Sequence, residues 1–86
     1  MADSSESIDV AKRYVKQNQR TIKRLEDKVG VTDPIEIRIL QETVVRKALI
    51  VLLDGGYNVP EANMAIELAF KSEHSMQNAV QKVLGY

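Results

Sequence analysis

Few side chains in this chain of 86 residues are suited to covalent chemistry. There are no cysteines, and His74 is the only histidine. It stands between Glu73 and Ser75, with no second histidine and no acidic cluster at a spacing that would complete a catalytic dyad or a metal site. We therefore expect His74 to lie on the surface or to cap a helix, and we expect no catalytic residue, no metal and no cofactor.

The pair Gly55 and Gly56 is a second candidate, because glycine-rich turns can cradle phosphate groups. Such a loop needs further glycines followed by a lysine or a hydroxyl residue. Here the pair is followed by Tyr57 and Asn58. The two glycines are instead expected to end a helix.

The clearest candidate for binding is a run of basic residues near the N-terminus. Twelve basic and twelve acidic side chains cancel over the whole chain, but residues 10–25 contain no acid. Bases that recur at steps of three or four form a ridge on a helix, which fits an acidic protein partner or a nucleic-acid backbone. A solvated helix face is also compatible with the pattern. The basic ridge consists of Lys12, Arg13, Lys16, Arg20, Lys23 and Arg24.

The same segment carries a narrow apolar seam, which predicts one amphipathic helix over residues 8–29. Residues 1–6 before it are expected to be a disordered tail. The spacing also fits heptads in which Asn18 is a polar seam residue, so the helix is expected to pair with a copy of itself or with a partner. In a pair, Asn18 would form a hydrogen bond between chains; otherwise it is solvated. The predicted self-association seam is Ile8, Val15, Asn18, Ile22 and Leu25.

The segments after the seam predict three further helices. Gly30 should end the first helix, and Asp33 followed by Pro34 should start the second. Residues 34–54 become apolar on every side toward their end, as in a central helix covered by the others. The alternation of isoleucines in residues 35–39 is also compatible with a short strand.

Two shorter amphipathic segments, residues 60–71 and 75–84, complete the pattern. Pro60 suits the start of the first of them. The predicted fold is therefore all-α, as a small four-helix bundle or an orthogonal helical array with a long N-terminal helix. Residues 7–86 are expected to form a single domain.

Two stretches resemble parts of known families. Residues 53–84 resemble a ubiquitin-associated domain through Gly56 with Tyr57 and Ala79 with Val80. The loop and the second helix are longer than in that family, and the match covers about a third of the chain. Residues 52–59 are similar to the start of the helix-turn-helix of many transposases. The recognition helix of those proteins carries basic or polar readers, whereas this chain offers only Gln77, Asn78, Gln81 and Lys82, so neither resemblance assigns a family.

Composition completes the functional expectation. The chain is 44% hydrophobic and 28% charged, like an ordinary globular domain. With no cysteine, no signal-peptide pattern and no apolar run longer than residues 48–53, it is expected to be cytoplasmic and to have no membrane partner. We expect a non-catalytic protein-interaction or regulatory module that forms a homodimer through its N-terminal helix. The alternative is a nucleic-acid-binding regulator that uses the basic ridge.

Overall fold

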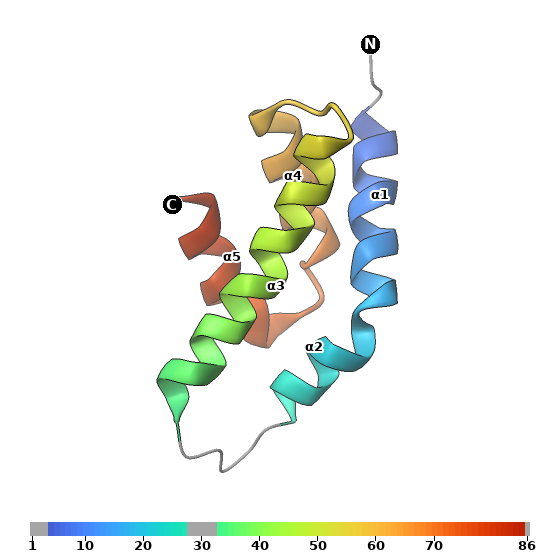
Figure 1. The fold of residues 1–86 in the computed structure, drawn as a ribbon. Coiled ribbons are helices and arrows are strands. Elements are labelled where there is room, and N and C mark those ends of the chain that lie inside the picture. Colours follow the sequence, from blue (N-terminus) through green and yellow to red (C-terminus); the bar gives the residue numbers. More distant parts are fainter. Residues whose placement is uncertain (1–3, 28–32, 86) are drawn as a thin grey trace.

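The computed structural model describes residues 4–27 and 33–85, and all regular structure within these ranges is helical (Figure 1). The predicted all-α class is confirmed. In chain order the elements are α1 (Ser4–Gln17), α2 (Gln19–Glu26), α3 (Pro34–Asp54), α4 (Val59–Ala69), the short 3-10 helix η1 (His74–Met76) and α5 (Gln77–Leu84). Helix α3 is central and contacts α1, α2, α4 and α5.

The N-terminal segment differs from its prediction at its start and in its middle. Helix α1 begins at Ser4, so residues 4–6 are helical and do not belong to a tail. Residues 1–3, and the predicted helix end at Val29 and Gly30, lie outside the described residues. The single helix predicted over residues 8–29 is divided at Asn18, and α2 turns toward α3 (Figure 1).

Asn18 explains this division. Its φ of −103° and ψ of 10° depart from helical values. The side-chain nitrogen Nδ2 donates a hydrogen bond to the Tyr14 carbonyl at 2.9 Å, which the Asn18 backbone N–H also reaches at 3.0 Å. Asparagine side chains that bond to nearby backbone in this way compete with regular helix formation, so the chain changes direction here.

The start and the end of α3 follow the predicted signals. Asp33 caps the helix, because one of its carboxylate oxygens accepts from the backbone N–H groups of Ile35 at 3.0 Å and Glu36 at 3.3 Å. Residues 35–39 are helical, so the strand alternative is wrong. At the other end, Gly56 has a φ of +95°, in the left-handed region that favours glycine.

The last two helices are held by local side-chain contacts. Asn58 caps α4 by accepting from the Glu61 N–H at 2.9 Å. The Gln77 side-chain amide donates to the carbonyls of Phe70 and Glu73, which ties α5 to the connection that precedes it. The predicted amphipathic pattern over residues 75–84 is divided between η1 and α5.

A single core lies between the helices and receives side chains from each α-helix. Helix α1 packs chiefly on α4, whereas α2 packs on α3. The largest fully buried apolar side chains are Phe70, Ile22, Leu52, Ile66, Met76 and Val45. The N-terminal apolar seam therefore joins α1 and α2 to the rest of their own chain.

Candidate functional site

A groove opens where the Asn18 bend brings α2 alongside the middle of α3. It has a volume of about 340 Å³. Its walls come from α1 and α2 on one side and from α3 on the other. The lining residues are Tyr14, Asn18, Thr21, Arg24, Leu25, Leu40, Thr43, Val44 and Lys47. We refer to this site as the α2–α3 groove.

The groove has an apolar floor and a polar rim. Leu25 and Val44 are buried at its base. Thr21, Arg24 and Lys47 are exposed around it. A concave surface that combines buried apolar side chains with a few polar groups is the usual form of a binding site.

The charges that line the groove have one sign. Among the described residues that line it, the charged ones are Arg24 and Lys47, and both are basic. In residues 4–27 and 33–85 the single ion pair joins Lys82 to Glu42, so neither groove base is neutralised by a neighbouring acid. The groove is therefore suited to a ligand that carries negative charge.

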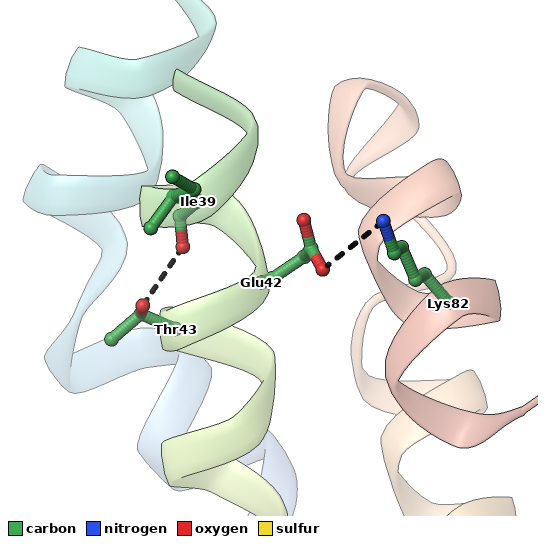
Figure 2. A network of polar contacts seen from close by, with 4 residues as sticks. All are labelled: Ile39, Glu42, Thr43 and Lys82. Atoms are coloured by element: carbon green, nitrogen blue, oxygen red, sulfur yellow. Dashed lines mark hydrogen bonds and ion pairs between the residues drawn. The ribbon is translucent and has the colours of Figure 1, made fainter. Parts of the chain in front are cut away.

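Three hydroxyl side chains line the groove, those of Tyr14, Thr21 and Thr43. Burial raises the pKa of Tyr14, so the phenol stays protonated and able to donate a hydrogen bond at neutral pH. The Thr43 hydroxyl donates to the Ile39 carbonyl at 2.8 Å, which fixes it on the α3 surface (Figure 2). Together with Arg24 and Lys47, the Tyr14 and Thr21 hydroxyls give the rim four residues that can donate to an acceptor-rich ligand.

Glu42 lies on the opposite side of α3 and does not reach the groove. Figure 2 shows its carboxylate directed toward Lys82 on α5, away from Thr43. The Lys82 Nζ lies 3.9 Å from the Glu42 carboxylate. A second hollow there, with a volume of about 290 Å³, is lined by Arg38, Glu42, Asn78, Ala79 and Lys82. Because Glu42 offsets a base in that hollow, the α2–α3 groove is the stronger anion site.

The structure places the basic ridge on the surface. All six of its side chains are exposed, and only Arg24 lines the groove. Lys12, Arg13 and Lys16 lie on α1, before the bend, whereas Arg20 and Lys23 lie on α2 beside Arg24. The ridge is therefore divided into two segments of different direction.

The predicted self-association seam is occupied within the chain. Val15, Ile22 and Leu25 are buried in the core, and Ile8 packs against it. Asn18 is half-buried, and its side-chain amide bonds within its own chain. These apolar atoms already contact the chain's own helices, so they do not form a free surface for a second copy.

The prediction that α3 is covered on every side is wrong. Ile35, Ile39, Ile50 and Leu53 are exposed, because the neighbouring helices pack on only part of its circumference. Sequence reasoning also missed the groove residues on α3. The signal available for them was the apolar composition of the whole of α3, which cannot tell a covered face from an open one.

The remaining candidates for chemistry stay isolated in the described ranges. His74 is exposed at the start of η1, as expected. In residues 4–27 and 33–85 no three metal-binding side chains come together. Among the helices of the same ranges, none combines the length and the apolarity needed to cross a bilayer.

Comparison with known proteins supplies no family for this arrangement. No protein-family model, no curated protein and no solved structure matches the chain. The functional argument therefore depends on the groove and the surface around it.

Proposed function

We propose that this chain is a non-catalytic interaction module that binds an acidic segment of a protein partner in the α2–α3 groove. The observation that carries the proposal is an apolar floor bordered by Arg24 and Lys47 with no acid in the lining. An aliphatic floor buries apolar side chains of the ligand, and two unpaired bases select carboxylates. The sparse reactive groups favour binding over catalysis.

A direct test uses a fluorescein-labelled peptide of about 18 residues, long enough for about five helical turns. Leucines are spaced three and four apart in it, and glutamates fill the other positions. Fluorescence anisotropy measures its Kd for the native chain and for the double variant Arg24→Glu with Lys47→Glu. Reversal of both groove charges is expected to weaken binding by at least about tenfold, because each base then repels the peptide.

The matched control reverses two exposed bases that do not line the groove, Lys12→Glu with Arg13→Glu. It changes the net charge by the same amount and is expected to weaken binding by less than about threefold, through long-range attraction alone. Equal losses in both double variants would show that binding follows net charge and not the groove. Equally tight binding of a peptide with lysine in place of glutamate would also contradict the proposal.

A second candidate function is nucleic-acid binding through the basic ridge. The observation that favours it is the exposure of all six ridge side chains, together with the absence of ion pairs to them in the described residues. Unpaired bases on one surface are the electrostatic feature that phosphate backbones require.

The test is a gel shift with duplex DNA and single-stranded RNA across a salt series. Binding through the ridge should weaken steeply as salt rises, because each phosphate contact releases counterions. It should also weaken in the double variant Lys16→Glu with Arg20→Glu. If no complex is retained even at low salt, this second candidate is excluded.

A further inference from the structure

One side of α3 carries four exposed apolar side chains that no helix of the described residues covers. Ile35 is 65% exposed, Ile39 57%, Ile50 49% and Leu53 39%. At about 100° per residue, these four positions and Arg46 fall within about 60° around the helix axis. We call these five residues the outer stripe. At a rise of about 1.5 Å per residue, the outer stripe is about 27 Å long.

The outer faces of α1 and α2 are charged, whereas α3 exposes apolar side chains near both of its ends. Single exposed apolar residues need no explanation, but two neighbouring pairs, Ile35 with Ile39 and Ile50 with Leu53, on the same side of one helix indicate a contact surface. The outer stripe follows one side of a straight helix, with apolar residues at both ends and one base between them. We propose that an amphipathic α-helix of an acidic partner lies along this stripe, with an acidic side chain against Arg46.

The charge pattern of α3 argues for an acidic partner. Arg46 and Lys47 lie near the centre of the helix and are exposed, and neither forms an ion pair in the described residues. The exposed acids Glu36 and Asp54 stand only near the two ends. A partner with an acid between two apolar groups therefore matches the stripe in both hydrophobicity and charge.

A second copy of the chain matches the stripe less well. An antiparallel pair that sets Ile35 against Leu53 and Ile39 against Ile50 brings the two Arg46 side chains within about one turn of each other. The acid at that level, Glu42, is buried and already pairs with Lys82, so it does not neutralise them. A parallel pair places them at the same level. Either arrangement puts like charges at the centre of the interface, where they destabilise pairing.

The stripe also adjoins the α2–α3 groove, so this inference rests on the proposed function. Leu40, Thr43 and Lys47 line the groove and occupy the flank of α3 next to the stripe. A helix that lies on the stripe can therefore direct acids from one flank toward Lys47 and Arg24. Contact with the outer stripe would require the acidic segment to be helical, whereas the groove alone sets no such requirement.

The test uses a labelled peptide of about 18 residues whose leucine face is interrupted at its centre by one glutamate. The double variant Ile39→Ser with Ile50→Ser is expected to weaken binding by about tenfold or more, because it removes the two apolar contacts on either side of Arg46. The matched control Met64→Ser with Leu68→Ser removes two exposed apolar side chains from α4. It should change the Kd by less than about twofold. Circular dichroism checks that each variant remains helical.

Two peptide changes test the helix and the central acid separately. Proline at the centre of the peptide breaks a helix and should abolish most of the affinity, whereas an extended ligand would tolerate it. Lysine in place of the central glutamate should weaken binding to the native chain. The same lysine peptide should regain affinity for the Arg46→Glu variant, because the charges are exchanged.

The outcomes separate this inference from the proposed function. If the groove reversal weakens binding but the stripe variant and the proline peptide do not, the groove proposal stands and the helix inference is overturned. If no glutamate-containing peptide binds, both fail. If sedimentation shows a dimer that the stripe variant dissociates, the occupant is a second copy and the inference is again overturned.

Discussion

The two N-terminal helices and α3 use their apolar residues in different ways. In α1 and α2 the large apolar side chains face the core, and charged residues cover the outside. In α3, Val45 and Leu52 are buried, while Ile39 and Ile50 on the other side remain exposed. A charged outer face thus marks a helix whose apolar contacts are complete within the chain, whereas α3 keeps apolar side chains exposed.

The largest predicted effect tests this difference by truncating one isoleucine in each region and comparing the loss of stability. Ile22 in α2 is fully buried and Ile50 in α3 is half exposed. Ile22→Ala should lower the free energy of unfolding by about 3 kcal/mol, through lost apolar burial and a cavity. Ile50→Ala should change it by no more than about 0.5 kcal/mol, because little packing is lost.

Urea denaturation followed by circular dichroism measures both effects. Ile22→Val removes a single methylene group and should cost about 1 kcal/mol, which gives a measurable result even if the alanine variant does not fold. Similar losses for Ile22→Ala and Ile50→Ala would show that the outer face of α3 is packed within the chain.

A smaller effect concerns how the two regions end their helices. The bend after α1 depends on the Asn18 side chain, but the end of α3 depends on the backbone of Gly56, at a φ of +95°. Gly56→Ala should cost about 1 kcal/mol, because a Cβ atom is strained in this conformation. Gly55→Ala is the control, since Gly55 has a φ of −77° and an added Cβ would lie 3.4 Å or more from its neighbours.

Thermal unfolding distinguishes the two glycines. The Gly55 variant should remain within about 0.5 kcal/mol of the native chain. Equal destabilisation of both variants would mean that space, and not backbone conformation, limits this turn.

The smallest predicted effect is on the pH dependence of stability, and it concerns Glu26 at the end of α2. Desolvation raises the pKa of Glu26 above its ordinary value of 4.5, the neighbouring Glu73 carboxyl raises it further, and a hydrogen bond with Ser75 acts in the opposite direction. Because the folded state disfavours the ionised form, folding is less stable once the pH rises from the ordinary value through the raised value. Glu26→Gln should therefore stabilise the chain by on the order of 0.5 kcal/mol at pH 7.

The pH profile is the diagnostic measurement for Glu26. Below the ordinary pKa both states of the native chain are protonated at this position, so the stabilisation by Glu26→Gln should disappear at pH 3.5. Asp9→Asn, which removes an exposed carboxylate from α1, controls for net charge. An advantage of Glu26→Gln that persists unchanged at pH 3.5 would contradict an ionisation effect.

The fold class and several helix ends could be predicted because they depend on local chemistry. Asp33 and Pro34 mark the start of α3, and Gly55 and Gly56 mark its end, through hydrogen bonds and dihedral angles of residues adjacent in sequence. The apolar spacing also identified Val15, Ile22 and Leu25 as contact residues. The apolar spacing could not show what these residues contact, which is the core of the same chain.

The groove and the outer stripe could not be predicted, because both depend on where neighbouring helices run. Periodicity shows which residues share a face of α3, but not which face is covered. The direction of α2 after Asn18 decides that Arg24 and Lys47 line one groove. An asparagine within a helical sequence pattern can continue the helix or bend it. The packing of the surrounding helices decides between these two conformations.

Because the chain turns at Asn18 (Figure 1), the basic ridge is divided between two short helices, α1 and α2, instead of following one long helix. Lys12 and Lys16 belong to the first, and Arg20 and Lys23 to the second. A stiff, straight polyanion can follow only one of these helices at a time, whereas a flexible polyanion can follow both. We therefore expect the nucleic-acid binding proposed for the basic ridge to depend on the stiffness of the ligand as well as on its charge.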